Sequence, residues 1–467
     1  MLDFKLKIGL VPERRWLADA KTRKGIFAAK YAVENKNHIL KYLKENFEDA
    51  QTEFVDLEWL NDEGLLSENS DCQKVADYLK AEKVDAIFLI NCNFGNEEAA
   101  GQIAKMMNVP TLLWGPQDME IEENGTRHTD AQCGLFAISK QFQRLKVPFT
   151  YIENCPIEDE AFTEGFNKFL SVVSIVKNFR DMRIVQVGTR LNLFKSVMAN
   201  ELELTEKFGF NMMTVHLLNF TQKFERIYAE EREQLIKEVA ELKAKYDSIE
   251  NPDEDLIKIM AMVHVYLEIF KETDADVLTS ECWTALPAKF GVNCCLAMSI
   301  LYDMGYIVTC ESDIVGAVTQ AILFAASRGK KPPLFGEFTC KNPTNKNSEL
   351  LWHCGPFPVS ARKKSEDAVV MAGKPCFCVE DGHYTIARFQ GGEGKYYLLG
   401  GEFDTCAGPK TIGTYMWAQF KDLAKLEHKL VNGPYIHHMS EIEGSYADVL
   451  KEFCKYVPEL IYDPIEE

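Results

Sequence analysis

The chain has 467 residues, of which 46% are apolar, and a formal net charge of −19 at pH 7. This length allows two to four domains with sizeable cores. So acidic a surface repels phosphate backbones, and we expect no nucleic acid partner.

Two features of the sequence indicate a cytoplasmic protein without membrane contact. The apolar runs fall short of the ~18 residues of a membrane-spanning helix, and the N-terminus lacks the apolar region of a signal peptide. The 14 cysteines are scattered through apolar segments rather than spaced as a framework. In such a protein we expect them to be reduced, buried and small hydrophobic side chains.

Strand and helix patterns alternate along the first part of the chain, with short loops between them. This alternation is typical of right-handed βαβ units and a parallel sheet. Asn96, followed by two glutamates, suits a helix start, because its side chain can cap the first turn and the acids match the helix dipole. We expect a first α/β domain over residues 1–175, with strands at 5–11, 53–57, 84–90 and 110–114 and helices at 22–45, 71–81 and 96–107.

The alternation restarts after a helical stretch at residues 158–178. Residues 221–271 are long, charged and helical in pattern, and Asn251-Pro-Asp divides them into a pair of helices. We therefore expect a second doubly wound α/β domain over residues 176–330, with 221–271 as a helical insertion. Its strands are expected at 182–187, 212–218, 276–279 and 306–310, and its other helices at 200–208, 285–304 and 314–326.

Beyond residue 330 the pattern changes to short alternating segments, which is typical of β-structure. Residues 391–395 are rich in glycine and suit a hairpin loop between two of these segments. We expect a third, β-rich domain over residues 331–467. Its strands are expected at 368–371, 375–379, 384–389 and 396–400, with one amphipathic helix at 414–430.

Two acids and a histidine each follow an apolar strand late in the chain, and a pair of histidines lies near its end. They are Glu311, Glu337, His353 and the pair His437-His438. Strand ends are where open α/β sheets place their chemistry. Two carboxylates with imidazoles are a ligand set for a borderline-hard divalent metal such as Mn²⁺. These residues therefore predict a metal or catalytic site.

The acids also have plain structural interpretations. A carboxylate at the mouth of a central strand, such as Glu311, needs a cation or a hydrogen-bond network, and we prefer a functional role to an ion pair with an arginine. Glu337 alone would be an exposed edge-strand acid, and its pairing with Glu311 favours function. Asp313 is expected to be the N-cap of the helix that begins at residue 314.

The histidines leave alternatives open. A lone histidine in an apolar strand, such as His353, is more often a satisfied core residue than a ligand. Neighbours in a strand point to opposite faces, so at most one of His437 and His438 should face a given metal. The other could bind substrate or a nearby carbonyl.

Further candidates for substrate contact also lie at or near strand ends: Glu281, Arg15, Arg190 and Trp352. Glu281 could face the same cleft or be a solvated loop acid. Arg15 and Arg190, with Arg14, suit an anionic or polyhydroxyl ligand, and ordinary surface charge is the alternative. No GxGxxG pattern follows the first strand, which argues against a dinucleotide cofactor.

Short motifs spread over most of the chain share the pattern of one enzyme family. They are Asn93-Phe-Gly-Asn-Glu-Glu98, Leu113-Trp-Gly-Pro116, Gln132-Cys-Gly134, Gly188-Thr-Arg190, the run from Cys294 to Gly305, Cys310-Glu-Ser-Asp313, Leu334-Phe-Gly-Glu337 and Trp352-His-Cys-Gly-Pro356. In these motifs the chain resembles the L-fucose isomerase / L-arabinose isomerase superfamily, in a short fucose-isomerase-like branch. The pair His437-His438 matches a His-His of the arabinose-type branch.

The resemblance implies both a fold and a set of residue roles. The fold would be two Rossmann-like domains followed by a β-rich, barrel-like domain. The assembly would be a homo-oligomer, a trimer or hexamer with sites near subunit interfaces, in which residues 221–271 could form a contact. Mn²⁺ would be bound by Glu311, Glu337 and His438, with His353 as a further ligand. Glu311 and Glu337 would be the acid/base pair, and the fucose branch often has Asp where this chain has Glu337.

The predicted function is a metal-dependent aldose–ketose isomerase, which moves a proton between C1 and C2 of a sugar through a cis-enediol. Each positioned proton transfer typically contributes ~10²–10⁴-fold. The expected substrate is a pentose or (deoxy)hexose, or an anionic hexose such as a 6-sulfonated sugar held by Arg14, Arg15 or Arg190. A non-catalytic sugar-binding or regulatory protein on the same scaffold, and a metal-dependent sugar epimerase or lyase, are the alternatives.

Overall fold

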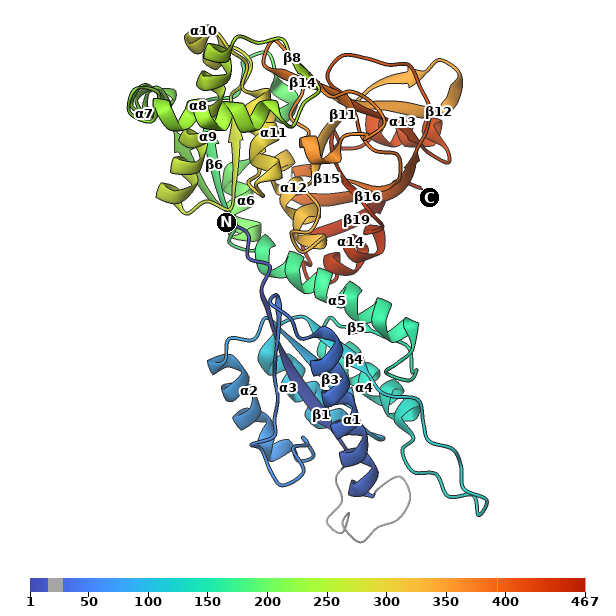
Figure 1. Ribbon diagram of the computed structural model, residues 1–467. Coiled ribbons are helices and arrows are strands. Elements are labelled where there is room, and N and C mark those ends of the chain that lie inside the picture. The colour runs from blue at the N-terminus through green and yellow to red at the C-terminus, as the bar shows by residue number, and fades with distance from the viewer. Residues whose placement is uncertain (16–27, 393, 467) are drawn as a thin grey trace. The chain divides into compact units, whose positions relative to one another are not determined.

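The computed structural model describes residues 1–15, 28–392 and 394–466. The chain divides into two compact units, residues 4–177 and residues 178–467 together with the first three residues. The first unit holds a parallel sheet, and the second holds a parallel sheet and a mainly antiparallel barrel (Figure 1). This arrangement confirms the predicted fold class. The expected boundary near residue 330 lies inside the second unit.

The sheet of the first unit is buried on both faces. Its parallel strands have the order β2-β1-β3-β4-β5, so the chain connections reverse direction between β1 and β3. Every residue of β3 is buried, as expected for a strand covered by helices on both sides. The strands are β1 (Leu6–Glu13), β2 (Thr52–Val55), β3 (Ala86–Asn91), β4 (Thr111–Trp114) and β5 (Thr150–Tyr151).

Two layers of helices cover this sheet (Figure 1). Helices α1 and α5 form one layer and meet through Phe47 and Phe166, and α2, α3 and α4 form the other. Asn96 caps α3 as expected, because its side chain accepts from the backbone N–H groups of Glu98 and Ala99. The helices are α1 (Ala29–Phe47), α2 (Cys72–Ala81), α3 (Glu97–Met107), α4 (Ala131–Leu145) and α5 (Glu160–Phe179). The start of the helix expected at 22–45 lies outside the described residues.

The parallel sheet of the second unit has the strand order β10-β9-β6-β7. The chain passes from β6 to β7 on one side and then to β9 on the other. The boundary between β6 and β9 is therefore the switch point at which open α/β sheets bind ligands. The strands are β6 (Arg183–Val187), β7 (Asn211–Val215), β9 (Val277–Ser280) and β10 (Val308–Thr309).

Helices pack around this second sheet, and their bounds agree in large part with the sequence pattern. Among the described residues, no helix combines the length and the hydropathy needed to span a lipid bilayer. The helices are α6 (Glu201–Phe208), α7 (Leu217–Glu230), α8 (Arg232–Lys243), α9 (Asp253–Thr273), α10 (Ala285–Phe290), α11 (Cys295–Asp303) and α12 (Ile314–Ala326). Short 3-10 helices lie at Asn69–Asp71 in the first unit and at Lys195–Val197, Cys310–Ser312 and Val359–Ala361 in the second.

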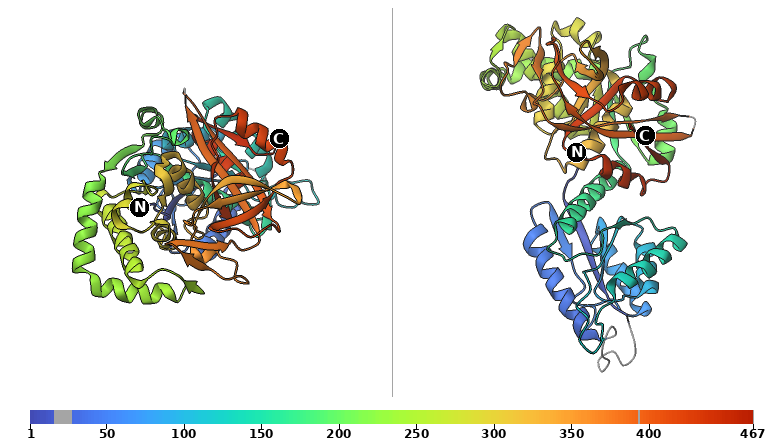
Figure 2. Two further views of the ribbon diagram at one scale, coloured as in Figure 1. Left: turned by 90° about the horizontal axis from the view of Figure 1, so that it is seen from above. Right: turned by 90° about the vertical axis from the view of Figure 1, so that its right-hand side faces the viewer.

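The remaining strands form a sheet that closes on itself. The order is β19-β16-β15-β18-β11-β12-β17-β14-β13-β8, and a further pairing of β16 with β17 joins the run between them into a ring. Figure 2 shows the later of these strands, orange to red, on the opposite side of the unit from the green helices. They are β8 (Ser248–Ile249), β11 (Leu334–Asn342), β12 (Asn345–His353), β13 (Val369–Met371), β14 (Lys374–Cys378), β15 (His383–Gly392), β16 (Lys395–Thr405), β17 (Thr414–Gln419), β18 (His438–Glu443) and β19 (Leu460–Pro464), with helices α13 (Leu423–Asn432) and α14 (Ala447–Cys454).

Four sequence-based expectations were wrong in this unit. The pair of helices expected at 221–271 is three helices, α7, α8 and α9, because α7 already ends at Glu230 and α8 begins at Arg232. The helix expected at 285–304 is two helices, because Gly291 adopts a positive φ of 74° and ends α10. The helix expected at 414–430 begins with β17, because the barrel offers the edges of β12 and β14 to that segment. Glu337 lies inside β11 rather than at a strand end, since β11 continues to Asn342 and pairs with β12.

Gly134 tests how tightly the first unit is packed. A Cβ at this position would lie 1.8 Å from the carbonyl oxygen of Phe94. The backbone would have to shift to make room for the methyl group. Gly134→Ala should therefore lower the thermal unfolding midpoint and reduce the free energy of unfolding by about 1–3 kcal/mol or more. Gly392→Ala is the control, because nothing lies within 4 Å of its added Cβ. Equal midpoints for the two variants, measured by calorimetry, would contradict this packing.

Candidate functional site

Glu311 stands in the turn that connects β10 to α12. Glu311 and Ser312 both have left-handed backbone conformations, with φ of 65° and 57°. Such conformations are unfavourable for residues other than glycine and persist where the surrounding structure imposes them. The next residue, Asp313, accepts the backbone N–H of Gly316 and so caps α12 as expected. The turn therefore holds the Glu311 carboxylate at the end of the parallel sheet.

The barrel brings the other candidate residues to the same place. Glu337 on β11 lies directly opposite His438 on β18, and His353 ends β12. The Oε2 atom of Glu311 lies 3.1 Å from Nε2 of His438, and the Oε2 atom of Glu337 lies 3.7 Å from it. We call Glu311, Glu337, His353, His437 and His438 the carboxylate–imidazole cluster, since their candidate ligand atoms lie within 4.8 Å of one another in two overlapping groups of three.

The pair His437-His438 differs from the expectation that only one of them would face the cluster. His438 is fully buried, and His437 is partly exposed, with its Nε2 atom 3.6 Å from Oε2 of Glu337. His437 precedes the first residue of β18, so the alternation of a regular strand does not apply to it. Burial and the neighbouring His438 lower the pKa of His437 to about 4, which keeps its ring neutral.

A buried ion pair fixes the orientation of His438. The Nδ1–H group of His438 donates to Oδ2 of Asp313 at 3.0 Å. Arg388 on β15 donates to the same carboxylate through Nη1 at 2.7 Å and through Nη2 at 3.2 Å, and the side chains of both partners are fully buried. Burial raises the pKa of Asp313, but Arg388 and His438 lower it by more. The net pKa is below the ordinary carboxyl value, so the carboxylate stays ionised. The bond to Asp313 occupies Nδ1, so Nε2 of His438 faces Glu311. Burial lowers the pKa of His438, but the contacts with Asp313 and Glu311 raise it overall.

The hydrogen bonds of His353 differ from those of His438. Its Nδ1 atom accepts the backbone N–H of Cys354 at 2.9 Å. A neutral ring with this acceptor carries its proton on Nε2. The Nε2 atom is buried, and no described residue forms a hydrogen bond with it. In this orientation Nε2 of His353 is a donor toward the cluster, whereas Nε2 of His438 faces Glu311.

Glu337 is suited to proton transfer. Burial raises its pKa above the ordinary carboxyl range, although His353 and His438 partly oppose that effect. A carboxylate with a raised pKa is a stronger base, and general catalysis is most efficient when the pKa approaches the working pH. The side chain is one-fifth exposed, so a ligand can reach it.

The loop after β6 lies beside the cluster. The ring of Phe194 is centred 5.8 Å from that of His437 and 5.5 Å from that of His438. Arg190 steadies this loop, because its Nη1 group donates to the backbone oxygens of Leu191 and Phe194. The cluster therefore faces the loop that leaves the switch point between β6 and β9.

The other candidates are placed as follows. Glu281 is buried and caps the turn into α10, because its Oε1 atom accepts from Thr284 and Ala285. Trp352 donates its indole N–H to the backbone oxygen of Ile412. Arg15 belongs to the first unit, where its guanidinium lies 4.2 Å from the ring centre of Phe94. Arg14, in the same unit, is paired with Glu63 at 2.6 Å.

Two residues of the site were missed from the sequence. Phe194 follows the Gly188-Thr-Arg190 motif but was assigned no role, and Arg388 was not singled out. An arginine within the apolar run of β15 was the available signal, because a charged residue in such a run needs a buried partner. The pattern could not say that this partner was Asp313, 75 residues away.

Comparisons with known proteins agree with this architecture. A family model described as "Fucose/sulfoquinovose isomerase, N-terminal domain" matches residues 20–180. Sulfoquinovose isomerase of Priestia aryabhattai is 23% identical over 306 residues, which are 66% of this chain and 67% of that protein. The corresponding isomerase of Alkalicoccus urumqiensis is 23% identical over 284 residues, 61% of this chain and 62% of that protein. These matches confirm the resemblance to the fucose-isomerase-like superfamily that was drawn from the motifs.

A solved structure gives a weaker likeness. A periplasmic solute-binding protein of an ABC transporter from Actinobacillus succinogenes 130z, with bound D-allose, matches over 70% of this chain and 93% of that chain at 10% identity. Its TM-score of 0.17 is too low to bear on the fold or the ligand of this chain.

Removal of Asp313 tests the ion pair behind the cluster. Asp313→Ala leaves the Arg388 charge buried without its partner, so we expect a loss of about 3–5 kcal/mol in the free energy of unfolding. Asp422→Ala is the matched control, because Asp422 also caps a helix but is exposed. Loss of an exposed cap alone should cost about 1 kcal/mol. Similar losses for both variants in urea denaturation would show that Asp313 is only a cap.

Proposed function

We propose that this chain is a metal-dependent aldose–ketose isomerase that acts on a sulfonated hexose. The enzyme class, an aldose–ketose isomerase, is confirmed by the named isomerase relatives. The substrate, the metal and the residue roles are proposals. The observation that supports them best is the approach of two possible metal-ligand atoms, Oε2 of Glu311 and Nε2 of His438, to 3.1 Å inside the protein.

The cluster fits a divalent cation. The Glu311 oxygen and the His438 nitrogen are buried, and neither has a hydrogen-bond partner among the described residues. Two lone pairs that face each other repel unless a proton or a cation lies between them. Carboxylate and imidazole donors suit Mn²⁺. Glu311, Glu337 and His438 would hold the ion, with His353 beside them, and it would supply Lewis-acid polarisation of two neighbouring sugar oxygens.

The protein's own side chains then account for the proton movements. Glu337, with its raised pKa, is the group we assign to take the C2 proton of the sugar and return it to C1. Glu311 is its acid/base partner and exchanges the hydroxyl protons. The Nε2–H group of His353 would donate to a sugar oxygen, and this role follows from the Cys354 N–H bond that occupies Nδ1. To bind the metal through Nε2 instead, His353 would have to lose the proton from that nitrogen.

The substrate assignment depends on positive charge in an acidic protein. The relatives are named sulfoquinovose isomerases, and a sulfonate needs cationic or N–H donors. Arg190 lies in the loop beside the cluster and uses Nη1 to hold that loop. Its planar fork suits an oxyanion. We assign Arg190 to the sulfonate, with His437 as a further candidate for substrate contact. Arg15, which belongs to the other unit, stays a separate prediction. Trp352 and Glu281 remain predictions of the same kind.

A substrate panel tests the reaction class and the charge preference together. After chelation and dialysis the protein should form no ketose, and Mn²⁺ should restore the activity. Sulfoquinovose should be preferred to uncharged glucose, L-fucose and L-arabinose by about tenfold or more in kcat/KM, because a charge-assisted hydrogen bond contributes about 1.5–3 kcal/mol. Product identity is read by NMR.

Each contrary result of the panel removes a different part of the proposal. Turnover that persists after chelation would contradict the proposed metal dependence. Preference for an uncharged sugar removes the sulfonate. An epimer or a cleavage product removes the isomerase, and tight sugar binding without turnover indicates the non-catalytic alternative.

Exchange of the C2 hydrogen tests the two carboxylates directly. Glu337→Gln and Glu311→Gln should each slow solvent deuterium incorporation at C2 by about 10²–10⁴-fold, because each removes a positioned proton acceptor. Glu349→Gln is the control. Burial raises the pKa of Glu349 to about 7, yet this acid lies outside the cluster. Undiminished incorporation in the Glu337 or Glu311 variant, measured by proton NMR, would reject that residue as essential.

A further inference from the structure

Five cysteine side chains among the described residues form a continuous row beside the carboxylate–imidazole cluster. The sulfur of Cys282 lies 3.1 Å from that of Cys310, and the sulfur of Cys295 lies 3.4 Å from that of Cys354. Cys294 contacts Cys282, and Cys354 contacts Cys310, through their side chains. We call Cys282, Cys294, Cys295, Cys310 and Cys354 the thiol cluster. Its members come from the ends of β9, β10 and β12 and from the start of α11.

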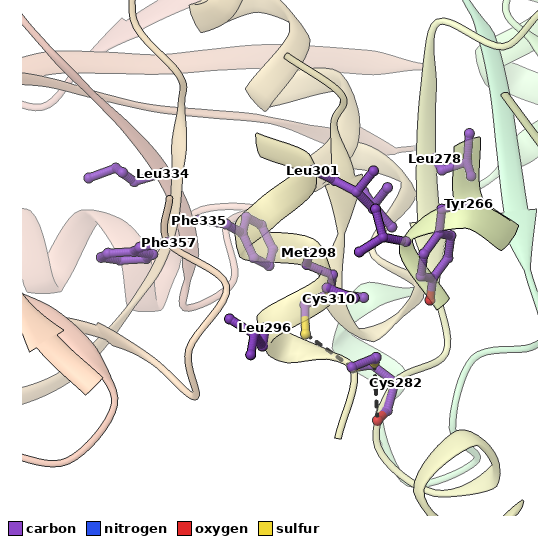
Figure 3. Close-up of a cluster of buried hydrophobic side chains, with 14 of the residues drawn as sticks. Tyr266, Leu278, Cys282, Leu296, Met298, Leu301, Cys310, Leu334, Phe335 and Phe357 are labelled. Atoms are coloured by element: carbon purple, nitrogen blue, oxygen red, sulfur yellow. Dashed lines mark hydrogen bonds between the residues drawn. The ribbon is translucent and has the colours of Figure 1, made fainter. Parts of the chain in front are cut away.

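The thiol cluster is set in an apolar core. Figure 3 shows Cys282 and Cys310 facing each other, close to Leu296 and Met298. Cys282, Cys294, Cys295 and Cys310 are buried, and Cys354 is partly exposed, so the row is open to solvent at one end. Isolated buried cysteines act as small hydrophobes. That role does not require five of them to gather from four separate segments.

A histidine completes the set of donors. The Nδ1 atom of His353 lies 3.3 Å from the sulfur of Cys354. One ligand atom from each of Cys310, His353 and Cys354 lies within 4.8 Å of the others. Two sulfurs and an imidazole nitrogen, with Cys282 and Cys295 each in contact with one of them, are the donors of a tetrahedral Cys₃His site.

We propose that the thiol cluster and Nδ1 of His353 bind a thiophilic divalent ion of the zinc class. Cys310, Cys354 and His353 are the core ligands, and Cys282 or Cys295 supplies the fourth. The ion would take the Nδ1 lone pair that now accepts the Cys354 N–H group, so that hydrogen bond would be given up on binding. The thiols that bind lose their protons to solvent. This site shares His353 with the carboxylate–imidazole cluster, but its other donors are sulfurs that a sugar isomerase reaction does not need.

Distances favour an ion over a disulfide. Around a tetrahedral zinc ion with Zn–S bonds of about 2.3 Å, neighbouring sulfurs lie about 3.8 Å apart. A disulfide brings the two sulfurs to about 2.05 Å. The observed separations of 3.1 and 3.4 Å are closer to the first value. Thiols that bind metal would move apart by a few tenths of an ångström, whereas a disulfide requires a closure of more than about 1 Å.

The two sites would sort metals by ligand type. Thiolates select zinc-like ions, and carboxylates with imidazole suit Mn²⁺. His353 lies between them, with Nδ1 toward the thiols and Nε2 toward Glu311 and His438. An ion on Nδ1 keeps the proton on Nε2, which is the state in which His353 donates to the carboxylate–imidazole cluster. Both ions can therefore be present together.

Cobalt is the spectroscopic probe for this site. The reduced, chelator-treated full-length protein is first saturated with Mn²⁺ and then titrated with Co²⁺. We expect a single equivalent to give a sulfur-to-cobalt charge-transfer band in the ultraviolet and tetrahedral bands in the visible region. Zn²⁺ should abolish both. The same bands should persist in Glu337→Gln, which separates this site from the carboxylate–imidazole cluster and from failure of the proposed function.

Cysteine variants decide whether the thiol cluster is the site. Cys310→Ser and Cys354→Ser should each weaken Co²⁺ binding by at least about tenfold, and Cys133→Ser, an exposed cysteine of the first unit, should not. Cys354 is partly exposed, so its variant serves if Cys310→Ser does not fold. Binding without a charge-transfer band, unchanged bands in folded Cys354→Ser, or a disulfide found by mass spectrometry in the reduced protein would overturn the proposal.

Discussion

The ion pair between Asp313 and Arg388 is the constraint on which the candidate site depends. It joins the start of α12, which belongs to the parallel sheet, to β15 of the barrel. The same carboxylate orients His438 on β18. A buried pair of charges is tolerated only when its geometry is good and its remaining polar atoms are satisfied. Here Gln390 accepts from Arg388, and Gly316 donates to Asp313. The pair therefore fixes how two sheets meet and which nitrogen of His438 faces inward.

Much of the fold could be predicted because its signals are local. Continuous apolar strands such as β3 indicate parallel sheets, and capping residues such as Asn96 mark helix starts. The wrong assignments arose where tertiary contacts decide. Residues 414–419 fit an amphipathic helix until β12 and β14 offer them backbone partners. The break at Gly291 needed a left-handed backbone conformation that periodicity does not reveal.

The candidate site shows the same division. Glu311, His353 and the histidine pair stood out because polar residues after apolar strands are unusual, and the structure brings them together. Their chemical roles stay predictions. Glu337 was found through a strand end that does not exist, since β11 continues past it. Arg388, the tautomers of His353 and His438, and the convergence of five cysteines all depend on contacts between residues far apart in sequence. No pattern within one segment could contain that information.

The left-handed backbone at Glu311 sets stability against activity at this position. Residues other than glycine pay about 1–2 kcal/mol for such a conformation, so a glycine there would relieve the main chain. The same change would remove the carboxylate that faces His438. Selection for a more robust fold and selection for turnover would therefore favour different residues at 311. At residue 311 the stability of the backbone and the proposed role of the carboxylate therefore oppose each other.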